Sequence, residues 1–278
     1  MRPLSKVYTA LIFVILYAPI AVMVLFSFNS INSTGVFAGF STYWYRELLR
    51  DGATLAALKN TLVLAVSSSL VATVIGTVAA VGIFKLKSRA AKSAIMTVTN
   101  IPMMNPDIVT GISMMLLFVF VCVKLAGAAS LSFATVLVAH ITFNLPYVIL
   151  SVMPKLGQLD PNLRDAALDL GCTPVQAFFK VIIHEILPGI LSGALMAFTM
   201  SLDDFVISYF VYGPGFVTLP VEIYNYTKKP LQPKIYALFT LLFLAILLVM
   251  VVMNLLQAGD DRRRRQARGV FKKKGANA

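Results

Sequence analysis

Residues 7–28 read VYTALIFVILYAPIAVMVLFSF, an apolar run of 22 residues without a charge. A helix needs about 20 such residues to cross a bilayer. Arg2 and Lys6 precede the run, as in a signal peptide, but the run is too long for one and no small-residue cleavage pattern follows it. We therefore predict an uncleaved first spanning helix.

The composition of the 278-residue chain favours a surface that faces lipid. Hydrophobic residues make up 58% of the chain and charged residues only 13%, whereas soluble domains carry roughly 25% charged residues. The net charge of +12 would suggest nucleic-acid binding in a soluble protein. Here the basic residues cluster between apolar stretches, which is typical of loops at a membrane surface, so we expect no nucleic-acid partner.

Charged residues and turns delimit five more apolar stretches. The sequence predicts an all-α, polytopic membrane protein with a single transmembrane domain over 1–278. Its six spanning helices are expected near 7–28, 60–84, 94–122, 130–153, 186–212 and 235–257.

The distribution of basic residues predicts the orientation. Six spans place both termini on one side, and if that side is the cytoplasm, 17 of the 24 basic residues lie inside. The positive-inside rule therefore favours cytoplasmic termini. The basic tail 260–278 either anchors the last helix or binds anionic lipid.

The loop 154–188 has the pattern of a capped amphipathic helix. Asp160 is suited to the N-cap and Pro161 to the first helical position. Gly171 supplies a C-terminal stop. One face of the expected helix is apolar, with residues at helical spacing: Leu163, Ala166, Ala167 and Leu170.

A second helix is expected to begin after Thr173. Thr173 and Gln176 fit a capping box, and Pro174 stands at the first helical position. On physical grounds the first helix fits either a groove on a partner protein or the lipid interface, and the residues alone leave both open.

The same loop resembles the EAA loop of binding-protein-dependent ABC importers. Asp165-Ala166-Ala167 followed by Gly171 matches the first half of that motif, with Asp in place of the usual Glu. The second half matches only loosely, because Ile186-Leu187-Pro188 comes four residues late. The resemblance implies that Asp165, Ala166, Ala167 and Gly171 couple this chain to a cleft on an ATPase subunit.

The resemblance also implies the assembly. The chain has no G-x-x-x-x-G-K-[ST] phosphate loop, so we expect no enzyme activity and no bound cofactor here, with ATP and Mg held by two separate ATPase subunits. A second permease subunit, an external substrate-binding protein, the bacterial inner membrane and the type I ABC importer permease fold are further expectations of the family.

Three acids fall inside the predicted spans: Asp107, Asp203 and Asp204. An Asp at the bilayer centre costs about 2.5–3.5 kcal/mol on insertion scales. Counted from the inner surface, Asp107 lies about 20 Å deep and the pair about 22–24 Å deep, at or beyond the midplane of a ~30 Å core. We expect them to face one cavity; the alternative is that one of them pairs with a cation of a partner subunit.

The surrounding residues favour a cavity for an organic cation. Asn105-Pro106 predicts a break in the third span, and broken helices are tolerated where they line a cavity. Carboxylates pair with ammonium groups and aromatic faces attract cations. Further expected features are a polar stripe (Ser201, Asp204, Ser208), a ridge of small residues (Gly189, Gly193, Ala197) and nearby aromatic residues (Tyr209, Tyr212, Phe143, Tyr147).

Three motifs resemble the second permease of spermidine/putrescine importers: Ser201-Leu202-Asp203-Asp204, Asn105-Pro106-Asp107-Ile108-Val109 and the stretch Gly39–Tyr45. The resemblance implies a polyamine substrate, with Asp107, Ser201, Asp203 and Asp204 in its pathway and spermidine and putrescine both open. Trp44 could contact substrate or the binding protein, or anchor the chain at the lipid interface.

Other chemistry is less well supported. We expect His140 to be a hydrogen-bonded packing residue rather than a proton relay. His184-Glu185 lacks a third metal ligand, and Cys122 and Cys172 indicate neither a disulfide nor a metal cluster. An intramembrane aspartic protease would need a G-x-G-D signature, which is absent. A secondary transporter or channel would leave the docking loop unexplained.

Overall fold

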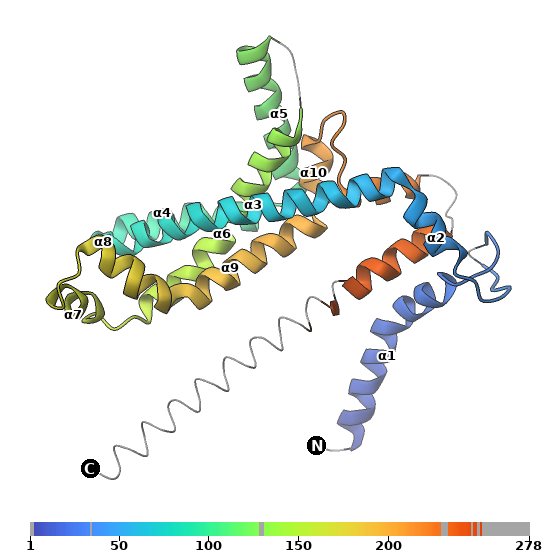
Figure 1. Cartoon of the computed structure of the whole chain (residues 1–278), viewed down its shortest axis with the longest axis horizontal. Helices are drawn as coiled ribbons and strands as arrows, with labels where there is room; N and C mark the ends of the chain where they lie inside the picture. Colours follow the sequence, from blue (N-terminus) through green and yellow to red (C-terminus); the bar gives the residue numbers. More distant parts are fainter. Residues whose placement is uncertain are drawn as a thin grey trace. The chain divides into compact units, whose positions relative to one another are not determined.

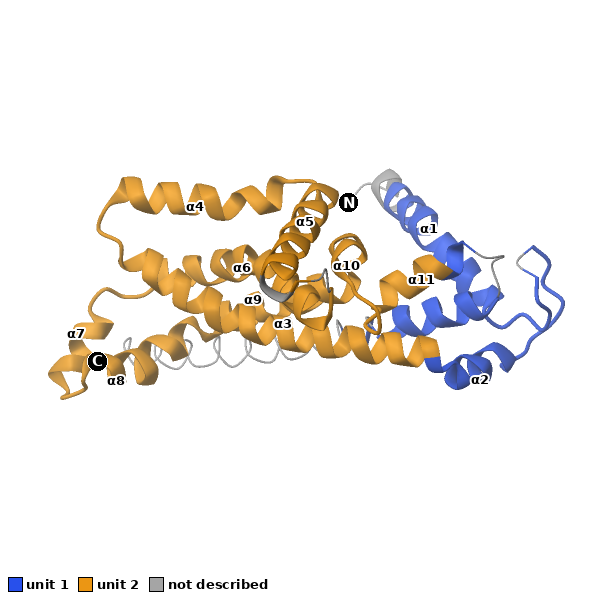
Figure 2. Cartoon of the chain, turned by 90° about the horizontal axis from the view of Figure 1, so that it is seen from above, with its two compact units in different colours: residues 1–52, 226–278 blue, residues 53–225 orange. Residues whose placement is uncertain are grey.

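The computed structural model describes residues 3–33, 35–127, 131–228, 233–245, 247–248 and 251. These residues form helices joined by turns and loops, with one isolated β-bridge between Asn29 and Phe40. The chain divides into two compact units, residues 1–52 with 226–278 and residues 53–225, coloured separately in Figure 2.

The first unit contains α1 (Pro3–Phe26), α2 (Tyr43–Arg50) and the apolar helix Pro233–Ala245. The loop before α2 folds around Asn29. The Asn29 side chain donates to the carbonyls of Ser33 (2.8 Å) and Val36 (2.7 Å) and accepts from the Ala38 N–H (3.0 Å). These bonds satisfy three backbone polar groups of the loop through one side chain.

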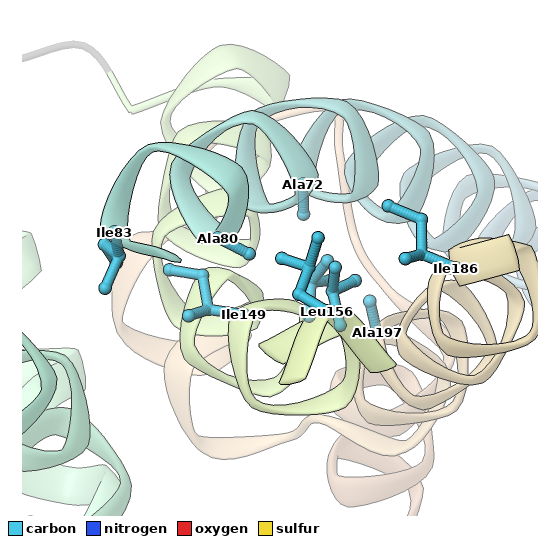
Figure 3. Close-up of a cluster of buried hydrophobic side chains, with 9 residues drawn as sticks. Ala72, Ala80, Ile83, Ile149, Leu156, Ile186 and Ala197 are labelled. Atoms are coloured by element: carbon cyan, nitrogen blue, oxygen red, sulfur yellow. The ribbon is translucent and has the colours of Figure 1, made fainter. Parts of the chain in front are cut away.

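The second unit is built on α6 (Phe133–Gly157), which packs against α3 (Gly52–Lys85) and α9 (Ile183–Asp203), both drawn in Figure 1. Their shared core is apolar, and Figure 3 shows its side chains converging from the three helices. The members are Ala72, Ala80, Ile83, Val148, Ile149, Val152, Leu156, Ile186 and Ala197.

Small residues allow the close approach in this core. A Cβ at Gly193 would lie 3.1 Å from the Val148 Cα, and one at Gly189 would lie 2.9 Å from the Ser151 carbonyl oxygen. The predicted ridge of Gly189, Gly193 and Ala197 is therefore confirmed as the surface of α9 that meets α6.

Five described helices are long and apolar enough to cross a membrane: Val7–Phe26, Gly52–Lys85, Asp107–Lys124, Phe133–Gly157 and Pro174–Asp203. The predicted sixth span contributes the shorter helix Pro233–Ala245. Most of its remaining part, and the basic tail 260–278, lie outside the described residues.

Two predicted spans are interrupted. The third consists of α4 (Arg89–Met104) and α5 (Asp107–Ala126), so the predicted break at Asn105-Pro106 is confirmed. The fifth, predicted as one helix to residue 212, ends at Asp203 and resumes as α10 (Val206–Val211), followed by α11 (Leu219–Thr227). A continuous helix over 186–212 was therefore a wrong prediction.

The loop 154–188 contains α7 (Leu163–Asp169), α8 (Pro174–Ala177) and a turn of π-helix, Phe178–Ile182, that leads into α9. The capping box is confirmed, since the Thr173 hydroxyl accepts from the Gln176 N–H and the Gln176 side chain accepts from the Thr173 N–H.

Gly171 ends α7 as predicted, in the left-handed conformation with φ +83°. The N–H groups of Gly171 and Cys172 donate to the carbonyls of Leu168 (2.9 Å) and Ala167 (3.1 Å), the pattern of a Schellman motif. The predicted N-cap at Asp160 was wrong, because Asn162 holds that position. The Asp160 carboxylate closes a turn on the Asn162 N–H instead (2.9 Å).

Candidate functional site

The break between α9 and α10 is closed by the side chain of Asp204. Asp204 has extended backbone angles, φ −63° and ψ 117°, so the helical hydrogen-bond ladder stops there. The N–H groups of Ile207 and Ser208 donate instead to the Asp204 carboxylate, at 3.2 and 2.7 Å. The carboxylate thus replaces the helical acceptors that the break removes.

The same carboxylate contacts His140 on α6. The His140 Nε2 lies 3.4 Å from Asp204 Oδ2 and 3.0 Å from the Ser208 hydroxyl. The side chains of His140 and Asp204 are 1% and 8% exposed, so the contact is shielded from solvent. His140 is thus a hydrogen-bonded packing residue, as predicted. We call Asp204, His140 and Ser208 the Asp204 clasp.

One turn further along α6, a second polar contact joins three helices. The Asn144 side chain donates to the Ser201 hydroxyl at 2.7 Å, and Ser201 bonds Ser68 of α3 at 2.9 Å. All three side chains are buried. Because unsatisfied polar groups are costly in an apolar interior, these bonds fix the end of α9 against α3 and α6.

The predicted pathway residues therefore lie in different surroundings. Ser201 and Asp204 are buried and hydrogen-bonded within the protein. Asp203, the last residue of α9, and Asp107, the first residue of α5, are exposed. Of these four residues, only Asp107 and Asp203 present carboxylates at the surface of this unit.

A group of aromatic rings lies next to the second break, just after Asp203 and Asp204 in the chain. Phe205 contacts Tyr209 and Tyr224, with ring centroids 5.4 and 4.8 Å apart, and Tyr209 lies 5.5 Å from Tyr224 and 6.3 Å from Tyr212. The sequence had indicated Tyr209 and Tyr212. It had not indicated Phe205 and Tyr224, although Phe205 stands next to Asp204.

An open pocket of about 250 Å³ lies beside the first break, between α4, α5 and α6. Its polar lining includes Asn105, Thr110 and Ser113, and its apolar lining includes Met114 and Phe143. The hydroxyls of α5 were missed in the sequence, although Thr110 and Ser113 stand at helical spacing just after Asp107. The pocket combines apolar walls with a few polar groups.

Trp44 lies in the other unit and is buried, with 8% of its surface exposed. Its Nε1–H donates to the Asn29 carbonyl at 2.8 Å. The ring thus closes the loop that Asn29 organises, and this position supports neither the predicted contact with substrate or binding protein nor the predicted lipid anchor.

The short helix α7 presents the residues of the EAA-like segment. Asp165 and Ala166 are exposed and Ala167 is buried. Leu170, at the end of the apolar stripe, is 86% exposed, and Leu163 at its start is half-buried. The apolar face of α7 is therefore divided between packing on this chain and a surface left open.

Comparison with known proteins assigns the family. Residues 72–266 match the family described as "Binding-protein-dependent transport system inner membrane component". The chain belongs to this family. The permease is 38% identical over 252 residues to the putrescine transport system permease protein PotI of Escherichia coli (strain K12), covering 91% of this chain and 90% of PotI.

Two further relatives carry the name of the spermidine/putrescine transport system permease protein PotC. The permease is 36% identical over 259 residues to PotC of Escherichia coli (strain K12), covering 93% of this chain and 95% of the relative. It is 33% identical over 253 residues to PotC of Haemophilus influenzae, covering 91% and 96%.

Solved structures of low sequence identity share the fold. A bacterial ABC transporter involved in the import of the acidic polysaccharide alginate superposes with a TM-score of 0.68 at 13% identity, covering 90% of this chain and 94% of that chain. The MetNI methionine ABC transporter superposes with a TM-score of 0.56 at 19% identity, covering 77% and 95%.

The comparisons confirm the type I importer permease fold and the resemblance seen in the motifs. The chain is a membrane permease subunit of an ABC importer, a class of subunit that is not itself an enzyme. The secondary-transporter and protease interpretations were therefore wrong.

Proposed function

We propose that this permease forms half of the pathway of an ATP-driven polyamine importer in the bacterial inner membrane. It pairs with a second permease, receives putrescine or spermidine from an external binding protein, and is driven by two ATPase subunits that bind ATP and Mg. Both of its termini lie in the cytoplasm, as the excess of basic residues in those segments favours. The names of its relatives PotI and PotC support the substrate class.

The observation that carries this proposal is the exposure of Asp107 and Asp203 in spanning segments. Exposed acids at membrane depth mark cation pathways in many transporters. A polyamine carries ammonium groups separated by methylene chains. Carboxylates bind the ammonium groups, and aromatic rings such as Phe205 and Tyr209 attract cations by about 0.5–2 kcal/mol each.

The pocket beside the first break suits the methylene part of such a substrate. Met114, Leu117 and Phe143 give it an apolar wall, and Thr110 and Ser113 place hydroxyls along one side. Asp107 follows the pocket residue Asn105 by two positions. The arrangement offers apolar contact for the chain of a polyamine and polar contact near its charge.

The decisive experiment measures uptake by the whole complex. The permease, its partner permease, the ATPase and the binding protein are reconstituted in liposomes, and ATP-dependent entry of radiolabelled putrescine and spermidine is followed. We expect the double variant Asp107→Asn, Asp203→Asn to reduce uptake at least about tenfold, because charge-assisted hydrogen bonds contribute about 1.5–3 kcal/mol and 1.4 kcal/mol is a factor of ten.

The matched control is Asp160→Asn, which neutralises an acid in the loop before α7 rather than in a spanning segment. It should leave uptake unchanged. Unchanged uptake in the double variant would contradict the cation pathway, and uptake that continues without the ATPase subunits would contradict the ATP-driven importer.

The coupling to the ATPase has its own test. Leu170→Asp places a charge on the exposed end of the apolar face of α7 and should abolish uptake while the permease still reaches the membrane, because the side chain is 86% exposed. Val175→Asp, at a 65% exposed position on α8, is the control and should retain uptake. Wild-type uptake by Leu170→Asp would exclude α7 as the docking helix.

A further inference from the structure

We infer that Asp204 is a positioning residue rather than a ligand of the transported cation: the Asp204 clasp fixes the break between α9 and α10 and thereby directs Asp203 into the pathway. The part that concerns Asp203 rests on the proposed function. The part that concerns the break rests on geometry alone.

The Asp204 carboxylate is already engaged by groups of the protein. It accepts from the N–H groups of Ile207 (3.2 Å) and Ser208 (2.7 Å), and His140 Nε2 lies 3.4 Å away. A carboxylate has about four lone-pair sites, so little capacity remains. The side chain is also 8% exposed. A passing cation would have to displace His140 and uncap α10 to reach it.

The local sequence offers no other cause of the break. Sharp breaks in helices arise from Pro, from Gly/Ser pairs, from π-bulges or from a side chain that inserts into the hydrogen-bond ladder. Residues 202–206 read LDDFV and contain none of the first two, and the described π-helix lies at the other end, at Phe178–Ile182. Only the Asp204 carboxylate enters the ladder here.

The contacts at this end of α9 also set the direction of Asp203. Ser201 of α9 contacts Asn144 of α6, and Asp204, the residue that follows α9, contacts His140 of the same helix. Successive residues of a helix are turned by about 100°, so Ser201 and Asp204 share a face, and Asp203 is turned about 200° from Ser201. Fixing that face on α6 therefore leaves Asp203 on the opposite side, where it is exposed.

The two neighbouring acids should consequently respond differently to the same substitutions. At position 204 the shape and the acceptor oxygens matter, and Asn keeps one of the two oxygens that accept from the N–H groups of Ile207 and Ser208. At position 203 the negative charge matters, so Asp203→Asn should impair putrescine uptake about as much as Asp203→Ala. We expect Asp204→Asn to rescue most of what Asp204→Ala loses, and no such rescue at position 203.

The test measures KM and maximal uptake rate for putrescine per folded complex in liposomes, together with the thermal unfolding of each purified complex. Asp203→Asn and Asp203→Ala should both raise KM at least about tenfold, the loss of one ion pair, with an unchanged unfolding temperature. Asp204→Ala should lower the unfolding temperature and the maximal rate, and Asp204→Asn should restore both with KM within about twofold of wild type.

A double-mutant cycle with His140→Gln separates the two acids further. The losses from Asp204→Ala and His140→Gln should be non-additive, because both open the same clasp. The losses from Asp203→Ala and His140→Gln should add. If the buried His140→Gln variant does not fold, the comparison of Asp204→Asn with Asp203→Asn decides the question by KM alone.

A KM raised as much by Asp204→Asn as by Asp203→Asn would overturn the inference, since Asp204 would then bind the cation. An unfolding temperature of Asp204→Ala equal to that of Asp203→Ala would also overturn it. Failure of the proposed function looks different: the wild-type complex would not take up putrescine or spermidine, while the clasp variants would keep the expected order of unfolding temperatures.

Discussion

The two breaks in the spanning helices of the second unit are made by different chemistry. At the first break, Asn105 is extended with ψ 140° because it precedes Pro106, which disfavours a helical residue before it. At the second break, the extended residue is Asp204 with ψ 117°, and no proline is present between Asp203 and Val211. A covalent restriction makes the first break, and a carboxylate held by another helix makes the second.

This difference implies that the breaks differ in what they depend on. The first is local, and its acid, Asp107, stays exposed at the start of α5. The second depends on a buried histidine of α6 and so on the packing of the whole unit. The two meet where α5 packs on α10: a Cβ at Gly111 would lie 2.9 Å from the Phe210 ring and 3.4 Å from the Val206 carbonyl oxygen.

The largest loss of stability is expected from a substitution at the contact between α5 and α10, the helices that follow the two breaks. Gly111→Leu should force α5 away from α10 and destabilise the permease by about 3 kcal/mol, the upper end of the usual range for overpacking. Thermal unfolding of the complex and uptake measure it. Gly82→Leu is the control, because nothing lies within 4 Å of a Cβ there. Equal unfolding temperatures would contradict the close contact of α5 and α10.

An intermediate loss of stability is expected when the polar contact of Ser201, beside the second break, is removed. Ser201→Ala leaves the Asn144 amide donor and the Ser68 hydroxyl buried without their Ser201 partner and should cost about 1–2 kcal/mol. The control is Ser67→Ala, whose hydroxyl is exposed and bonds the Val63 carbonyl of its own helix (2.6 Å). If both variants unfold at the same temperature, the Ser201 contact does not support the break.

The smallest effect is expected at the first break. Pro106→Ala should cost less than about 1 kcal/mol, chiefly by giving the unfolded chain more freedom, because packing on α10 still holds α5. Uptake should remain near the wild-type level. A loss of uptake larger than that of Asp204→Ala would show that transport depends more on the proline at the first break than on the carboxylate at the second.

The sequence predicted the features that depend on neighbouring residues. The apolar runs gave the spans, Pro106 gave the first break, and Thr173 with Gln176 gave the capping box. The small residues of α9 likewise stand at regular spacing, so the sequence predicted the ridge that meets α6. The family followed from the loop motif and from the acids, and the comparison with known proteins confirms it.

The sequence did not predict features that depend on distant partners. Asp204 and Asp203 look alike in the chain, and only His140 on another helix distinguishes them. Trp44 was interpreted as a surface aromatic residue because its acceptor, the Asn29 carbonyl, leaves no sequence pattern. The N-cap of α7 was displaced by two residues because Asp160 and Asn162 are both suitable caps.

Chemical labelling at the two neighbouring positions tests whether Asp203 faces the pathway while Asp204 is shielded. In a permease carrying Cys122→Ser and Cys172→Ser, Asp203→Cys and Asp204→Cys are made separately and treated in the assembled complex with a water-soluble, positively charged thiol reagent. We expect Asp203→Cys to react readily and to be protected by putrescine, while Asp204→Cys reacts far more slowly. Equal reaction at both positions, or reaction at Asp203→Cys that putrescine does not slow, would contradict it.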